Sequence, residues 1–322
     1  MNEHGTNTTT TLRVGFCAIV GRPNVGKSTL LNRILGEKIA AVTPKPQTTR
    51  NRITGIKNRS DAQIVFVDTP GIHRGRSGLN RYMVEQALQA AAECDVILTI
   101  VAAPTAAAAA AATTIPQNDG AILPNDGERY VIEALASSSK PRVLAINKID
   151  LLPRKDLLLP AIEGYRRLFG FDEIVPISAL EGEGLEDLVT AVATHLPVGD
   201  RLFPEDMITD LAERFLAAEL VREQLFLLLG AEVPYSAAVT IEEFAERAES
   251  GDVVISADIH VERESHKAIV IGAGGRMIKE IGTKARQEIT RLLGRAAHLK
   301  LFVRVDPDWT KSRGGLRRLG YE

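Results

Sequence analysis

Apolar and polar positions along the first two thirds of the chain predict strands that alternate with helices. Apolar runs typical of buried strands occur at 14–20, 63–67, 96–101, 142–146 and 173–177, with a further strand at 51–57. Helical spacing follows at about 30–35, 80–93, 129–137, 156–169 and 184–195. This alternation predicts a mostly parallel sheet with helices on both faces. We therefore expect an α/β domain over residues 13–197, after a frayed tail at 1–12.

The pattern changes after residue 197. Residues 198–207 hold glycine and proline and predict a linker. A helix is expected at 208–229, with Leu211, Phe215, Ala218 and Leu225 on its apolar face. Further strands are expected at 239–241, 253–261 and 299–305, and helical segments at 266–271, 276–281 and 283–293. Residues 208–322 thus predict a smaller α+β domain that ends in a basic tail.

Composition indicates the cellular compartment and shows that charge is unevenly distributed along the chain. The 322 residues are 45% hydrophobic and 25% charged, as in soluble globular proteins. The first residues lack the pattern of a signal peptide, and no apolar run reaches ~18 residues, so we expect a cytoplasmic protein with two reduced core cysteines. Residues 201–264 carry 5 Lys/Arg against 15 Asp/Glu, whereas residues 265–322 carry 13 against 5. A basic terminal part is typical of a nucleic-acid site.

Residues 102–127 differ in composition from the rest of the first domain. Residues 106–112 are all alanine and are followed by Thr, Pro, Asn, Asp and Gly. Polyalanine forms helix readily but buries little surface. We expect a solvent-exposed insertion, partly helical and partly disordered.

A phosphate-binding loop joins the first strand to the first helix. It has the pattern G-x-x-x-x-G-K-S, whose backbone N–H groups converge on phosphate oxygens at a helix N-terminus. In this loop Lys27 would reach the β- and γ-phosphates, and the Ser28 hydroxyl would ligate Mg²⁺. The predicted nucleotide contacts are Gly21, Arg22, Pro23, Asn24, Val25, Gly26, Lys27, Ser28 and Thr29.

The next buried strand ends in Asp68-Thr69-Pro70-Gly71. At that place Asp68 would hold the water shell of Mg²⁺, and the Gly71 amide would face the γ-phosphate. The exposed loop 42–50 carries Thr48 and Thr49, either of which can close over Mg²⁺ as an order/disorder switch. Position 72 is Ile72, whose apolar side chain cannot orient a water molecule, so we expect slow hydrolysis without a partner.

The base is predicted from Asn147-Lys148-Ile149-Asp150, at the end of a later strand. A carboxylate at Asp150 accepts hydrogen bonds from N1–H and the amino group of guanine, and adenine offers no such pair. Backbone N–H groups in Ser178-Ala179-Leu180 would donate to guanine O6. The bound nucleotides are therefore GTP and GDP. Catalysis would rest on Lys27, Thr48, Thr49 and Gly71, and Mg²⁺ on Ser28, Thr48, Thr49 and Asp68.

A glycine-rich turn in the basic part predicts nucleic-acid binding. It matches the loop by which KH domains clamp four backbone nucleotides. Its predicted RNA contacts are Ile271, Gly272, Ala273, Gly274, Gly275, Arg276 and Lys279. Trp309 would either stack on a base or cap the small core. His260, His266 and His298 show no metal-ligand spacing.

The order of these motifs resembles the Era-type GTPases. The most specific segments are 21–32, 47–50, 68–71, 147–150, 203–206, 222–223, 261–263, 270–272 and 316–321. The resemblance covers about Gly15 to Tyr321 and implies an N-terminal GTPase domain and a C-terminal KH domain of the second topological type. It also implies GTP-regulated binding near the 3′ end of 16S rRNA, assistance in assembly of the small (30S) ribosomal subunit, and peripheral association with the inner face of the cell membrane. We expect the protein to be a monomer. The alanine-rich insertion and the extra Gly274 depart from the family pattern.

Two alternatives remain open at the level of sequence. One is a nucleotide-gated RNA-binding assembly factor with negligible intrinsic hydrolysis, which Ile72 motivates. The other is a related GTPase of tRNA modification or ribosome assembly that lacks a true KH domain.

Overall fold

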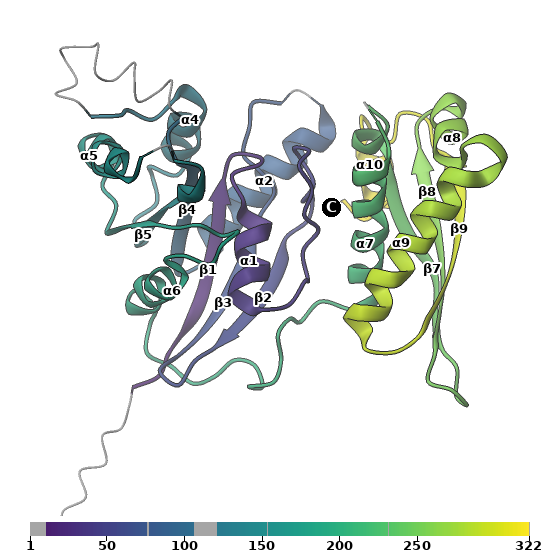
Figure 1. Cartoon of the computed structure of the whole chain (residues 1–322), viewed down its shortest axis with the longest axis horizontal. Coiled ribbons are helices and arrows are strands. Elements are labelled where there is room, and N and C mark those ends of the chain that lie inside the picture. The colour runs from purple at the N-terminus through teal and green to yellow at the C-terminus, as the bar shows by residue number, and fades with distance from the viewer. Residues whose placement is uncertain (1–10, 76, 106–120, 153, 231, 322) are drawn as a thin grey trace, which may run out of the picture.

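The chain forms two sheets, each with its own helices, that lie side by side (Figure 1). The structure is a computed structural model and describes residues 11–75, 77–105, 121–152, 154–230 and 232–321. Within those residues, no helix is long and apolar enough to cross a membrane.

The first sheet has six strands in the order β2-β3-β1-β4-β5-β6. All neighbouring strands pair in parallel except β2 and β3, as the mostly parallel prediction requires. Helices α1 and α6 cover one face, and α2, α4 and α5 cover the other. The bounds are β1 Arg13–Gly21, α1 Lys27–Leu35, β2 Ile53–Asn58, β3 Ala62–Asp68, α2 Gly78–Glu93, β4 Val96–Ala102, α4 Asp126–Ala134, β5 Arg142–Asn147, α5 Leu158–Leu168, β6 Glu173–Pro176 and α6 Leu185–Thr194.

The end of the predicted insertion is packed rather than exposed, which corrects that expectation. Ala121 and Ile122 are buried, and Ile122 packs on Ala161 of α5. Helix α4 begins at Asp126, three residues earlier than predicted, because the Asn125 side chain caps it. Residues 106–120, with the alanine run, lie outside the described residues.

The second sheet has three strands in the order β7-β8-β9. Strand β7 (Ala238–Glu246) is antiparallel to β8 (Val253–Val261), and β9 (Ala297–Val305) is parallel to β8. Helices α7 (Glu213–Leu228), α8 (Glu264–Ile271) and α9 (Arg276–Leu293) pack on one face. This α-β-β-α-α-β order is that of a KH domain of the second type, as predicted.

Two expectations for this region are wrong, and one open alternative is decided. Helix α7 begins at Glu213, and from Glu219 to Phe226 every residue is buried, so the predicted apolar stripe is replaced by burial on all sides. Gly282 does not divide α9, which runs unbroken over 18 residues. Trp309 is fully buried against α10 (Arg313–Arg318) and Tyr321, so of its two predicted roles packing in the core holds, and stacking on a base is excluded in this conformation.

The predicted linker lies along the edge of the first sheet. The amide of Gly199 donates to the carbonyl of Leu12, and those of Leu202 and Phe203 donate to the buried Gln63 side chain. The amide of Ile56 in β2 donates to the carbonyl of Ile208. These bonds fix the start of the second region to the first sheet.

Candidate functional site

The glycine-rich loop after β1 is held by the motif at the end of β5. The side-chain Nδ2 of Asn147 donates to the carbonyl of Val25 over 2.7 Å, and Lys148 Nζ donates to the carbonyl of Asn24 over 2.7 Å. A Cβ at Gly26, where φ is +100°, would lie 2.4 Å from the Asn147 amide nitrogen. Only glycine permits both this φ and this approach. The two motifs, far apart in sequence, therefore form one rigid site.

Lys27 is buried at the centre of this loop. Its Nζ donates to the carbonyl of Arg22 over 3.0 Å and lies 3.4 Å from that of Gly21. Burial lowers the pKa of Lys27 to about 8, although the Asp68 carboxylate acts to raise it. A buried ammonium held only by carbonyls is favourably placed for an anionic oxygen. The surrounding pocket is lined by Pro23, Asn24, Gly26, Lys27, Ser28, Thr29, Ala41, Val42, Thr43, Gln47, Thr48, Thr49 and Gly71.

Asp68 converges with two hydroxyls at the same pocket. Ser28 Oγ donates to Asp68 Oδ2 over 2.6 Å and lies 2.8 Å from Thr49 Oγ1. Thr48 instead bonds to Thr43 Oγ1 over 2.6 Å and to the carbonyl of Lys45 over 3.0 Å. In this conformation Thr49, not Thr48, therefore lies beside Ser28 and Asp68.

These groups fit Mg²⁺. Asp68 Oδ1 is buried and has no hydrogen-bond partner among the described residues. Burial raises the pKa of Asp68 to about 6 against the opposing effect of Lys27. A carboxylate oxygen and two hydroxyls are the hard oxygen donors that Mg²⁺ prefers, and a cation there would offset the cost of burying the carboxylate.

The segment after β3 folds back onto the glycine-rich loop. Thr69 Oγ1 donates to the carbonyl of Ile19, and the amide of Ile72 donates to that of Gly21. A Cβ at Gly71 would lie 2.6 Å from the backbone nitrogen of Pro23. The Ile72 side chain is 1% exposed in the core, so it points away from the pocket. His73 bonds to Gly71 O and to Gln47, which the sequence did not reveal.

The predicted base-recognition residues lie at the ends of β5 and β6. Asp150 Oδ1 accepts a hydrogen bond of 2.6 Å from Ser178 Oγ, which orients the exposed carboxylate. The amides of Ser178 and Ala179 already donate to Glu183 O and Asn147 Oδ1. Leu180 follows with its side chain 65% exposed.

The residue after Thr49 reaches into the second region. Arg50 is 1% exposed, and its guanidinium donates to the carbonyls of Pro234, Tyr235 and Ala237 over 2.7–3.0 Å. It also lies 5.7–5.9 Å from the ring centres of Phe226, Trp309 and Tyr321. Thr49 and Arg50, which are adjacent in sequence, thus contact the predicted metal position and the second domain, respectively. The sequence did not predict the contact of Arg50 with the second domain.

Further contacts join the same loop to α7. The buried carboxylate of Glu223 accepts from the Val42 amide over 2.8 Å and from Lys38 Nζ over 2.7 Å. Lys45 Nζ donates to the carbonyls of Phe226 and Leu229. These partners explain why polar residues of α7 are buried. The pairing of Arg222 with Glu219 buries two more charges beside them.

The glycine turn of the second domain is open to solvent. Gly272, Gly274 and Gly275 have φ values of +69°, +60° and +76°. A Cβ at Gly274 or Gly275 would meet nothing within 4 Å. Ala273, Arg276 and Lys279 are exposed, and α9 begins immediately after the turn. A glycine backbone and two cations therefore lie together at an exposed helix start, while the amides of Gly272, Gly275 and Arg276 donate to carbonyls within α8 and the turn.

Comparisons with known proteins match both regions. Residues 16–148 match the family model for a 50S ribosome-binding GTPase, and residues 232–310 match that for a KH domain. GTPase Era of Geotalea uraniireducens is 51% identical over 310 residues, covering 96% of this chain and 98% of that protein. GTPase Era of Trichlorobacter lovleyi is 49% identical over 97% of this chain and 99% of that protein.

Two solved structures agree along nearly the full length. A variant of Aquifex aeolicus Era bound to GDP and AlF₄⁻ is 43% identical, with a TM-score of 0.85, over 96% of this chain and 99% of that chain. A structure of Era in complex with MgGDPNP and nucleotides 1506–1542 of 16S ribosomal RNA is 43% identical, with a TM-score of 0.86 and the same coverage. The alternative without a KH domain is thereby excluded.

Proposed function

This chain belongs to the family of Era GTPases, and from that premise we propose that its bound nucleotide controls how the KH domain binds ribosomal RNA. The chain binds guanine nucleotide with Mg²⁺ and hydrolyses GTP. The observation that carries the proposal is that Thr49, at the nucleotide pocket, is followed directly by Arg50, whose guanidinium is hydrogen-bonded to backbone carbonyls of the KH domain.

In the proposed site the loop 21–29 surrounds the phosphates, with Lys27 on the β- and γ-oxygens. Ser28, Thr49 and Asp68 would hold Mg²⁺, which when bound neutralises charge on the phosphates. Asp150 would accept from the guanine N1–H and amino groups, and Asn147 and Lys148 would hold the loop in place. The Gly71 amide would donate to the γ-phosphate.

Hydrolysis is proposed to be slow without a partner. Ile72 supplies no group that orients water, and its side chain is packed in the core. The remaining positioning groups are backbone amides, Lys27 and Thr49, which stabilise charge on the phosphates but do not activate a nucleophile. A partner would therefore raise the rate by supplying or ordering a group near the γ-phosphate.

The proposed RNA ligand is the 3′ end of 16S rRNA in the small ribosomal subunit. The glycine turn at 272–275, the exposed Arg276 and Lys279, and the basic C-terminal residues support this ligand, because phosphates are bound by cations beside a backbone that they can approach closely. The solved Era complex holds a 16S segment together with MgGDPNP. We expect the GTP form of this chain to bind such RNA more tightly than the GDP form does.

The proposal includes a cellular setting that the family resemblance supports. The protein would act as a monomer in the cytoplasm, with peripheral association at the inner face of the cell membrane. Gel filtration of the full chain and fractionation of cells test these two statements separately.

Phosphate release measured with and without small ribosomal subunits tests the enzymatic part. We expect slow release from the protein alone and faster release with subunits. The alternative, a nucleotide-gated RNA-binding factor with negligible intrinsic hydrolysis, predicts equal and background rates in both cases. Lys27→Ala provides the blank, because it removes the phosphate-binding ammonium.

A further inference from the structure

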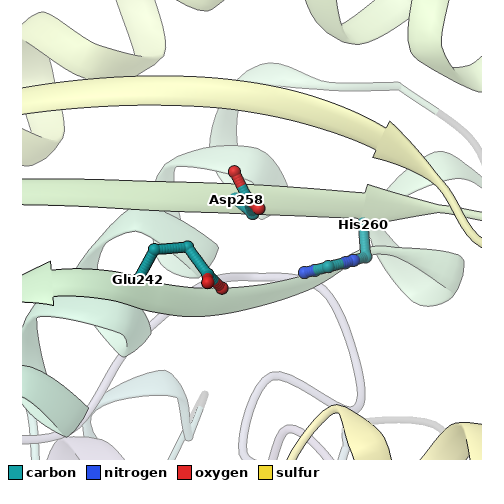
Figure 2. A group of neighbouring side chains, drawn as sticks. All are labelled: Glu242, Asp258 and His260. Carbon is teal, nitrogen blue, oxygen red and sulfur yellow. The ribbon is translucent and has the colours of Figure 1, made fainter.

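The open face of the second sheet carries a group of side chains that the nucleotide and RNA sites do not use. Glu242 on β7 and Asp258 and His260 on β8 place one potential ligand atom each within 4.8 Å of one another. Figure 2 shows the Glu242 carboxylate and the His260 ring directed toward each other along the strands. Asp258 and His260 share this face because they are two residues apart in a strand.

The backbone of β7 is irregular at this place. Its register with β8 shifts between Ile241 and Glu243, so Glu242 is the extra residue of a β-bulge. Bulges redirect side chains and occur frequently next to functional sites. The Glu242 side chain here reaches the Thr240 hydroxyl over 2.8 Å.

Only one of the two carboxylate oxygens of Asp258 has a hydrogen-bond partner among the described residues. Asp258 is 2% exposed and its Oδ2 accepts from Arg304 Nε. Its Oδ1 is buried and has no hydrogen-bond partner among the described residues. An unpartnered buried carboxylate oxygen is costly, and a cation is the partner that compensates it best.

His260 is held as metal-binding histidines are. Its Nδ1 lies 2.6 Å from Asp306 Oδ2, which fixes the proton on Nδ1 and leaves the Nε2 lone pair available. Nε2 lies 2.8 Å from Thr240 Oγ1, the same hydroxyl that bonds Glu242. The Thr240 hydroxyl has a single proton, so it cannot donate both to the Glu242 carboxylate and to the Nε2 lone pair of His260. One of these two acceptors is therefore left for a cation.

We propose that Glu242, Asp258 and His260 form a divalent transition-metal site, with Zn²⁺ as the ligand of choice. One imidazole nitrogen and two carboxylate oxygens suit Zn²⁺, whereas Mg²⁺ and Ca²⁺ need more oxygen donors and rarely use imidazole. Asp306 orients His260, and Arg304 holds the second oxygen of Asp258. The site is independent of the GTPase chemistry and stabilises the junction of β7 and β8.

The test is equilibrium dialysis of the full chain against Zn²⁺ in excess Mg²⁺ after chelator treatment, with bound zinc counted by mass spectrometry. We expect one saturable equivalent in the wild type, weakened at least about tenfold in Glu242→Gln and His260→Gln. Glu242 is exposed, so its substitution does not threaten folding. The matched control is His298→Gln, because His298 is exposed on β9 beside a single carboxylate and should leave binding unchanged.

Thermal unfolding gives a second readout. Zn²⁺ should raise the melting temperature of the wild type and of His298→Gln but not that of Glu242→Gln. Asp306→Asn should weaken zinc binding about 10–100-fold, as loss of an orienting carboxylate does. No saturable zinc in the wild type, or equal zinc in Glu242→Gln, would mean that Glu242, Asp258 and His260 do not form a metal site.

Discussion

The nucleotide pocket and the glycine turn of the KH domain each place a glycine backbone at the start of a helix, but in opposite settings. In the pocket, Gly26 lies against Asn147, and Lys27 and Asp68 are buried with shifted pKa values. In the turn, Gly274 faces open space and its neighbouring cations are exposed. The pocket is preorganised for one ligand, and its buried charged groups destabilise the folded protein until that ligand binds. Among the described residues, the turn has no buried unpaired group of this kind, and its proposed ligand is a flexible RNA backbone recognised mainly by charge.

The difference predicts where substitutions act strongly. Changes in the pocket should remove binding or reverse selectivity, because each group has a fixed partner. Changes in the turn should reduce affinity gradually and depend on salt. The following experiments test this contrast, beginning with the largest effect.

Asp150→Ala should remove the preference for GTP over ATP. A side chain that matches two hydrogen-bond donors of the ligand discriminates by about a thousandfold or more, and alanine offers no such match. Competition of ATP against fluorescent GDP measures the ratio. A ratio that stays high in the variant would place base recognition elsewhere.

Lys27→Ala should weaken GDP binding about a hundredfold through loss of a charge-assisted contact with phosphate. Calorimetry with GDP and Mg²⁺ gives the affinity. Lys148→Ala is the comparison, because its ammonium bonds to the Asn24 carbonyl and only positions the loop, so a smaller loss is expected. Equal losses in both variants would contradict the role of Lys27.

Acidification should weaken Mg²⁺-dependent nucleotide binding about tenfold per pH unit below about 6, the raised pKa of Asp68. Below that pH the carboxyl must lose its proton before it binds Mg²⁺. The stability of the nucleotide-free protein changes in the opposite direction. As pH rises from 3.8 to about 6, Asp68 in the folded protein keeps a proton that it releases in the unfolded chain. The free energy of unfolding therefore falls over this pH range.

Asp68→Asn checks the same carboxylate. It should stabilise the nucleotide-free protein at pH 7 by about 1–2 kcal/mol while abolishing the pH dependence of Mg²⁺-assisted binding. Denaturant unfolding and nucleotide titration measure the two effects. A destabilised variant would show that Asp68 is satisfied without a cation.

Gly274→Asp should weaken binding of a single-stranded 16S 3′-end oligonucleotide by several fold. Beyond the residue itself and its two chain neighbours, no atom of the described residues lies within 4 Å of the added Cβ, and the backbone strain at φ +60° is modest because Asp adopts the left-handed region more readily than most residues. The loss should shrink as salt rises, since it comes from repulsion of phosphate. Filter binding at two salt concentrations measures it. An affinity equal to that of the wild type would argue against the turn as an RNA contact.

The sequence predicted the elements whose pattern is local. Consecutive apolar runs predicted the buried strands, and their pattern correctly placed Gly21, Asp68 and Asn147 at the carboxyl ends of β1, β3 and β5, with Lys27 at the start of the helix that follows β1. The sequence did not show which of Thr48 and Thr49 lies beside Asp68, because that depends on how the loop turns at Gln47, where φ is +63°.

The sequence did not predict features that depend on contact between the domains. The stripe predicted for α7 was wrong because Glu223 is buried as the partner of Lys38 and the Val42 amide. Arg50 was read as part of an exposed loop because nothing local shows that carbonyls and aromatic rings of the other domain surround it. His260 was passed over because Glu242 joins it only through strand pairing and a bulge.

The most direct test of the account compares RNA affinity in the GTP-analogue and GDP forms of the wild type, Arg50→Met and Arg52→Met. Arg52 is the matched control, since it pairs with Glu93 within the first domain. We predict about tenfold tighter RNA binding in the GTP-analogue form of the wild type and of Arg52→Met, and a ratio near one in Arg50→Met. Equal RNA affinity in both nucleotide forms of the wild type, or an unchanged ratio in Arg50→Met, would contradict control of the KH domain through Thr49 and Arg50.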